Sequence, residues 1–128
     1  MCKLVPFASV LILIVFLLPA CGSASGPVRT MEDYLNALVA KDATRLSTLS
    51  CADWAQSAAV EMDSFQAVTA SLEGLSCEVT GTDGAFTLVT CQGNIVTSYN
   101  GETQQFDLSL RTYQVVEQGG ETLVCGYR

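Results

Sequence analysis

The sequence predicts an α+β domain, with N-terminal helices packed on one face of a curved, four-stranded antiparallel meander sheet. Two observations support this fold class. Apolar residues recur at helical spacing up to Gly74, after which apolar and polar residues alternate. The rest of the chain is then divided into four strands by three glycine-containing turns. These turns are Asp83-Gly84, Asn100-Gly101 and Gly119-Gly120.

Three helices are expected before the strands. Thr30 and Asp33 form a capping-box pattern, and the helix that follows them should end near Lys41. Asp42 can cap a short second helix. Asp53 can cap a third helix with a long apolar stripe on one side. The stripe consists of Trp54, Ala58, Met62, Phe65, Val68 and Leu72.

The start of the chain has the outline of an export signal. Lys3 precedes an almost unbroken apolar run over residues 4–18. This run is shorter than the ~20 residues that a membrane-spanning helix needs. We therefore expect residues 1–20 to be a signal peptide, with an uncleaved signal anchor as the alternative.

The residues that close the apolar run, Leu18-Pro19-Ala20-Cys21, resemble the bacterial lipobox. In lipoproteins of this kind, the cysteine after the cleavage site is lipidated and becomes the new N-terminus. The resemblance thus implies a lipid anchor on Cys21 and a location at the cell membrane or the outer surface, outside the cytoplasm. Residues 21–27 are then a flexible Gly/Ser-rich tether, and residues 28–128 are the folded domain.

Composition argues against several function classes. The chain has a net charge of −7, and once Lys3 leaves with the signal peptide, 5 basic side chains remain against 13 acidic ones. This balance argues against binding to nucleic acid or to anionic lipid headgroups. The chain has no histidine, so we expect neither a metal site nor histidine-based catalysis, and the sequence predicts no cofactor.

Four cysteines remain for the folded domain, and an even number in an exported domain predicts disulfides. A hairpin that pivots on Gly84 places Cys77 opposite Cys91. Side chains alternate between the two faces along each strand, and paired residues of neighbouring strands share a face. When this rule is followed from strand to strand, Cys125 falls on the same face as Cys77 and Cys91, toward the helices. We therefore predict the disulfides Cys77–Cys91 and Cys51–Cys125, unless a β-bulge shifts the alternation. The core face predicted in this way comprises Leu75, Cys77, Val79, Val89, Cys91, Ile95, Phe106, Leu108, Leu110, Leu123 and Cys125.

The opposite face of the sheet carries a second apolar group in the same register. Leu88 opposes Tyr113, and Val115 lies between Phe86 and Val124. A contiguous apolar patch on an open sheet face is typical of an interaction surface. We expect these five residues to bind a second copy of the chain or another envelope protein, and the alternative is an ordinary half-apolar surface.

Three segments resemble the NTF2-like, cystatin-related α+β superfamily, which includes small bacterial lipoproteins. They are residues 34–38 with Lys41-Asp42, residues 49–51 and residues 124–127. The resemblance extends over residues 28–128. It implies a cone-shaped pocket between helices and sheet, where the enzymes of the superfamily, such as steroid isomerases and dehydratases, pair an acid or a histidine with a tyrosine or another polar group.

Trp54, Phe65 and Tyr127 are the candidate pocket residues, because their aromatic side chains can line a small-ligand cavity. Trp54 is otherwise a core residue. No residue is predicted to be catalytic, since the chain has no G-x-S-x-G motif, and Glu61 should face water. We expect a non-catalytic binding or scaffolding protein of the cell envelope. The alternatives are a carrier or sensor of a small hydrophobic ligand and, third, an isomerase or dehydratase.

Replacing Cys21 with alanine should abolish incorporation of a labelled lipid precursor, because the thiol that carries the diacylglyceryl group is lost. The measurement is metabolic labelling of the wild-type and variant chains. Cys2→Ala is the matched control, since Cys2 lies within the predicted signal peptide. Persistent labelling of the Cys21 variant contradicts the lipid anchor.

Overall fold

The computed structural model describes residues 26–128, which form three helices and five strands. The helices are α1 (Gly26–Ala40), α2 (Ala43–Thr48) and α3 (Ala52–Asp63). The strands are β1 (Thr69–Asp83), β2 (Phe86–Tyr99), β3 (Glu102–Asp107), β4 (Thr112–Gln118) and β5 (Glu121–Tyr127). The predicted signal peptide and Cys21 lie outside the described residues. No helix within residues 26–128 is long and apolar enough to cross a membrane.

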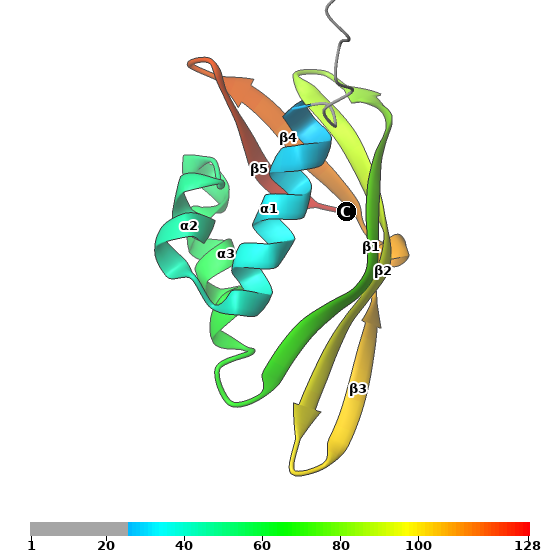
Figure 1. Ribbon diagram of the computed structural model, residues 1–128. Helices are drawn as coiled ribbons and strands as arrows, with labels where there is room; N and C mark the ends of the chain where they lie inside the picture. The colour runs from blue at the N-terminus through cyan, green and yellow to red at the C-terminus, as the bar shows by residue number, and fades with distance from the viewer. Residues whose placement is uncertain (1–25) are drawn as a thin grey trace, which may run out of the picture.

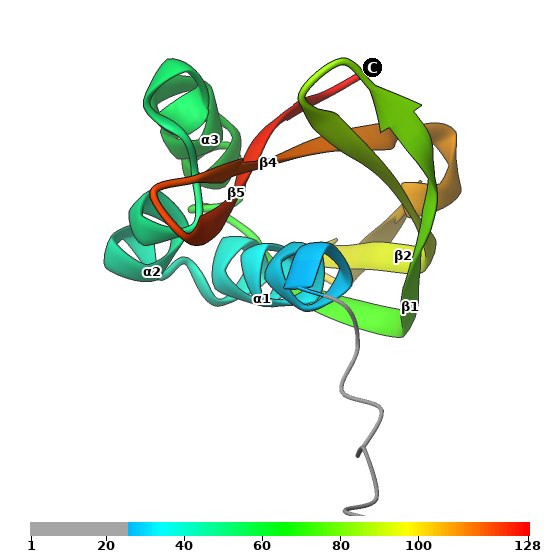
Figure 2. The ribbon, with the colours of Figure 1, turned by 90° about the horizontal axis from the view of Figure 1, so that it is seen from above.

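The three helices lie on one face of an open antiparallel sheet, which confirms the α+β class (Figure 1). The strand order is β1-β2-β4-β5, and β3 pairs with the C-terminal half of β2, residues 94–99. The sheet is strongly curved, so that α1 packs between β1 and β5 (Figure 2). This curvature leaves the ends of β1, β2 and β3 extending beyond the helices (Figure 1).

Local sequence explains the first two helices. α1 begins at Gly26, before the predicted capping box at Thr30, so its first residues include part of the segment expected to be a tether. Pro27 suits this early start, because a proline in the first helical turn sacrifices no helical hydrogen bond. Asp42 caps α2 as predicted, since its carboxylate accepts a hydrogen bond of 3.0 Å from the backbone N–H of Arg45.

The third helix is shorter than predicted. Its N-cap residue is Cys51 rather than Asp53, and it ends at Asp63, so the expected helical stripe to Leu72 was wrong. Val68 precedes β1 and Leu72 lies within it, and both pack against the core. A spacing of four residues fits a strand as well as a helix, because residues i and i+4 share a face in both.

The expected third strand is divided by a short 3-10 helix, η1 (Leu108–Leu110), so the sheet has five strands rather than four. Asp107 stabilises this break, because its carboxylate accepts hydrogen bonds from the backbone N–H and the hydroxyl of Ser109, at 2.9 and 2.6 Å. Beyond η1 the register has moved by one residue, and Tyr113 pairs with Val89 rather than with Leu88. Such a shift turns the side chains of β4 to the other face of the sheet. A second register shift lies between β4 and β5.

The shift overturns the predicted interaction surface. Tyr113, Val115 and Val124 are at most 1 % exposed and belong to the core. Phe86 and Leu88 stay partly exposed on the opposite face. The predicted core face was also wrong at three positions, which the structure leaves 45 %, 45 % and 81 % exposed: Val79, Phe106 and Leu110. Leu110 lies in η1, whereas Val79 and Phe106 precede the shift and keep the expected pairing with Val89 and Ile95.

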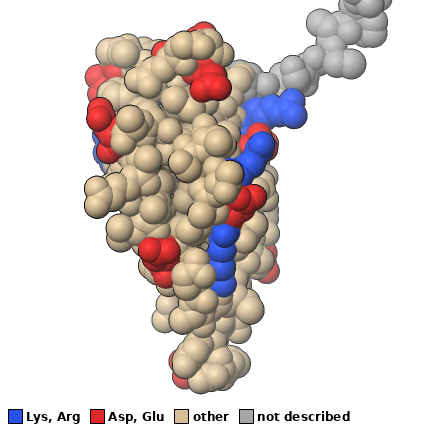
Figure 3. Space-filling view, turned by 90° about the vertical axis from the view of Figure 1, so that its left-hand side faces the viewer, with Lys and Arg blue, Asp and Glu red and all other residues tan. Residues whose placement is uncertain are grey.

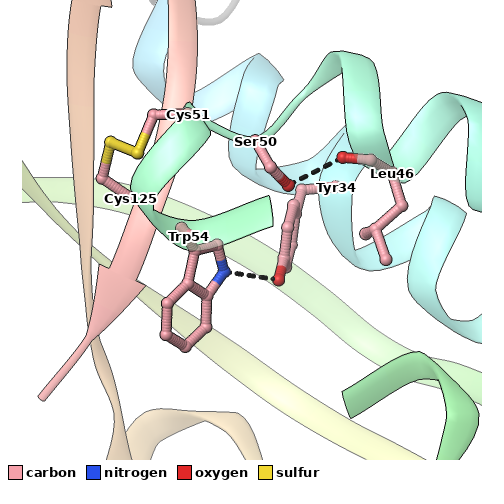
Figure 4. The surroundings of a disulfide bond; sticks show 6 residues. All are labelled: Tyr34, Leu46, Ser50, Cys51, Trp54 and Cys125. Carbon is pink, nitrogen blue, oxygen red and sulfur yellow. Dashed lines mark hydrogen bonds between the residues drawn. A yellow bond between two sulfur atoms is a disulfide. The ribbon is translucent and has the colours of Figure 1, made fainter. Parts of the chain in front are cut away.

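Both predicted disulfides are present. Cys77 lies directly opposite Cys91 in the β1–β2 pair, as the first hairpin predicts. The Cys51–Cys125 bond joins the loop between α2 and α3 to β5 (Figure 4). Backbone hydrogen bonds support the same junction, because Val124 donates to the Leu49 carbonyl and accepts from the Cys51 N–H, at 2.8 and 2.9 Å. The helical layer is therefore fastened to the edge of the sheet.

Removing the Cys51–Cys125 bond should destabilise the domain more than removing Cys77–Cys91, because the two bonds close loops with sequence separations of 74 and 14 residues. Loop entropy corresponds to losses of about 4.5 and about 3 kcal/mol. The measurement is urea unfolding of the two double alanine variants beside the wild-type domain. The opposite order of stabilities contradicts this account.

Candidate functional site

A cleft of about 810 Å³ lies between α3 and the sheet, with walls from β2, β3, η1 and β5. The three predicted pocket residues, Trp54, Phe65 and Tyr127, all line it. Trp54 projects from the first turn of α3, Phe65 follows the end of that helix, and Tyr127 ends β5. Residues from distant parts of the chain therefore meet around one space.

One end of the cleft is mainly apolar. Phe65 and Phe106 meet edge to face, with ring centroids 6.3 Å apart. Ile95 and Thr97 reach the cleft from β2, because alternate residues of a strand share a face. The exposure of Phe106, 45 %, is explained by its place at this wall, where α3 does not cover the sheet.

The other end of the cleft carries a charged pair. Arg111 donates from Nη1 to Oε1 of Glu61 at 2.6 Å, and the two side chains are 31 % and 14 % exposed. The guanidinium carbon of Arg111 also lies 4.0 Å from the centroid of the Tyr127 ring. Burial has the largest single effect on Arg111 and lowers its pKa, but the interactions with Glu61 and Tyr113 together outweigh burial, so the pKa ends above its usual range. Arg111 is therefore charged at every physiological pH.

Trp54 is held by a buried tyrosine. Its indole Nε1–H donates to the hydroxyl oxygen of Tyr34 at 2.9 Å (Figure 4). Burial raises the pKa of Tyr34 well above its usual range, which keeps the hydroxyl neutral. The indole also lies close to Gly126, where an added Cβ would come within 3.3 Å of the ring. The orientation of Trp54 at the cleft wall is thus fixed from two sides.

Two buried polar atoms near the charged pair have no hydrogen-bond partner in the described residues. They are Oε2 of Glu61 and the hydroxyl of Tyr113. Burial raises the pKa of Tyr113, and the Arg111 guanidinium offsets part of that rise. Buried polar groups are normally paired, and each unpaired one costs about 1–3 kcal/mol. Unpaired polar groups beside a cleft therefore lower stability, a cost that is typical of a site that binds a ligand.

Sequence reasoning missed the charged pair. Glu61 was expected to face water and is instead mostly buried, while Asp53 lies at the cleft rather than at a helix cap. Arg111 and Glu61 are 50 residues apart in the sequence, so no local pattern connects them. The sequence did contain one indication that Glu61 faces the cleft. Glu61 lies one turn after Ser57, on the helix face that also carries Trp54.

On the face that Figure 3 shows, Lys and Arg side chains follow one edge, with acidic side chains between them. Acidic side chains are scattered over the face that Figure 3 shows, and most of that surface is uncharged. Within residues 26–128, no group of three or more acidic or cysteine residues could hold a metal ion. The cleft is where a mostly buried ion pair and a buried, unpaired carboxylate oxygen occur together.

No protein-family model, no curated protein and no solved structure matches this chain.

Replacing Tyr34 with phenylalanine should lower the free energy of unfolding by about 1 kcal/mol, because the Trp54 N–H loses its acceptor. Tyr99→Phe is the matched control, since the Tyr99 side chain is 57 % exposed and should tolerate the change. The measurement is urea unfolding followed by fluorescence.

The same substitution should also reduce the loss of stability at alkaline pH. Tyr34 ionises near pH ~10 in the unfolded chain but resists ionisation in the folded one, so its stabilising contribution is lost as the pH rises above ~10. Equal alkaline sensitivity of wild type and Tyr34→Phe contradicts this assignment.

Proposed function

We propose that this protein is a lipid-anchored, extracytoplasmic binding protein that holds a small amphipathic molecule in the cleft without transforming it. The observation that carries the proposal is the cleft itself. Its volume of about 810 Å³ falls within the range of ~300–1,000 Å³ that is typical of small-molecule sites. Its walls combine aromatic and aliphatic side chains with one charged pair, the usual composition of such sites.

The cellular location of the protein is also part of the proposal. The lipobox resemblance at Cys21 supports a lipid anchor, and two disulfides are typical of proteins in an oxidising compartment outside the cytoplasm. We also propose that the domain is NTF2-like, because a cleft between helices and a curved sheet is what that resemblance implies. Binding is favoured over isomerase or dehydratase activity, since Arg111 holds Glu61 and the chain has no histidine.

A scaffolding role through the outer sheet face is less well supported. Three of its five predicted residues belong to the core, which leaves Phe86 and Leu88. Val116 pairs with Phe86 and extends this smaller patch, but it is itself only 8 % exposed. The remaining apolar area is that of an ordinary half-buried sheet surface.

Native mass spectrometry of the chain from Gly22 onward tests the proposal. This chain contains every described helix and strand, the whole described core and both disulfides. Exported through an oxidising compartment and purified gently, it should be a monomer that carries a reproducible added mass.

Substitutions at one cleft position and one remote position sharpen the test. Ser57→Phe should reduce the added mass by obstructing the cleft from α3, whereas Ser71→Phe, on an exposed β1 position away from the cleft, should keep it. An unliganded dimer would instead support an interface at the patch formed by Phe86 and Leu88. Equal added mass on both variants contradicts binding in the cleft.

A further inference from the structure

The charges that line the cleft are unequal in number, but those of Glu61 and Arg111 balance each other. Asp53, Glu61 and Asp107 are acidic, and Arg111 is the basic residue among the lining side chains. Asp107 has its own partners, because its carboxylate accepts two hydrogen bonds from Ser109. Glu61 and Arg111 neutralise one another where both are largely withdrawn from water. A ligand that reaches this end meets a neutral ion pair.

The pair nevertheless has hydrogen-bonding capacity to spare. A guanidinium has five N–H donors, and one nitrogen of Arg111 is engaged with Glu61. Glu61 has a second carboxylate oxygen, Oε2, which is buried and has no donor in the described residues, so a head group reaches it when the Glu61 side chain turns toward the cleft. The side chains therefore offer donors and an acceptor next to one another, with no net charge.

Charged head groups are poorly matched to this arrangement. A carboxylate attracted to Arg111 would approach Glu61, and an ammonium attracted to Glu61 would approach Arg111. Either ion would also lose hydration on entering the cleft, a cost that an already neutralised pair cannot offset. A hydroxyl or a carboxamide both donates and accepts hydrogen bonds and carries no charge, so it can use both partners.

We propose that the cleft selects a neutral amphipath, an alcohol or a primary carboxamide, whose head group binds at the Glu61–Arg111 pair. This inference rests on the proposed binding function and specifies its ligand class. The apolar body of the ligand lies against Phe65, Phe106 and Ile95. Glu61 and Arg111 are then the residues that determine specificity.

A series of eight-carbon probes that differ only in the head group tests the inference: octan-1-ol, octanamide, octylamine and octanoate. Trp54 is the single tryptophan of the chain and lines the cleft, so its fluorescence reports occupancy. Titrations of the chain from Gly22 onward at pH 7, where the amine and the acid are ionised, should show both neutral probes binding at least about tenfold more tightly than either ion.

Breaking the pair should change this order in opposite directions. Glu61→Gln leaves the positive charge of Arg111 unpaired, so octanoate should become the preferred probe. Arg111→Gln leaves the negative charge of Glu61 unpaired, so octylamine should become the preferred probe. The double variant is neutral again and should restore the preference for neutral probes.

The ion pair between Arg128 and Asp83 supplies matched controls, because it is exposed and lies outside the cleft. Arg128→Gln and Asp83→Asn should keep the wild-type order. Circular dichroism establishes that each variant is folded, and the wild-type series decides the inference even if a single variant is not.

The outcomes separate the two proposals. If the wild-type domain prefers an ion, or if folded Glu61→Gln and Arg111→Gln variants keep the wild-type order, the neutral head group is wrong while binding in the cleft stands. If no probe changes the fluorescence of Trp54 and calorimetry detects no binding, the proposed function itself is wrong.

Discussion

The break between β3 and β4 is the constraint on which the C-terminal half of the molecule depends. Asp107 captures the N–H and the hydroxyl of Ser109, and the chain turns through η1 instead of continuing as a strand. The extra residue in the turn directs Tyr113 and Val115 into the core. It also leaves Arg111 directly after the turn, where its side chain reaches Glu61 on α3. A local hydrogen-bonded turn thus sets both the core and the charged end of the cleft.

The cleft keeps its shape because its walls are fastened to one another at several points. α3 begins at Cys51, which is joined to β5 by the disulfide and by backbone hydrogen bonds. The Tyr34 hydroxyl then holds Trp54 from α1, and Tyr127 packs edge to face against Trp54 with ring centroids 5.5 Å apart. A preorganised site of this kind loses little conformational entropy when a ligand enters.

The features predicted from the sequence were those that depend on short-range chemistry. The Cys77–Cys91 pairing follows from one hairpin, and the Asp42 cap follows from one turn. The faces of the last two strands could not be predicted in this way, because one inserted residue at η1 reverses the alternation. The Asp107-x-Ser109 pattern was the available local signal for that break. The contact between Glu61 and Arg111 depends on the assembled fold, so only the tertiary structure reveals it.

The two disulfides are nested, since Cys77–Cys91 lies inside the loop that Cys51–Cys125 closes. A protease that cuts the β2–β3 hairpin at Asn100 would therefore produce two fragments that stay covalently linked. Strand pairing and the core on both sides of the cut would keep the fragments in register. The domain is thus built to survive nicking as a two-chain molecule, whose mass exceeds that of the intact chain by one water molecule until Cys51–Cys125 is reduced.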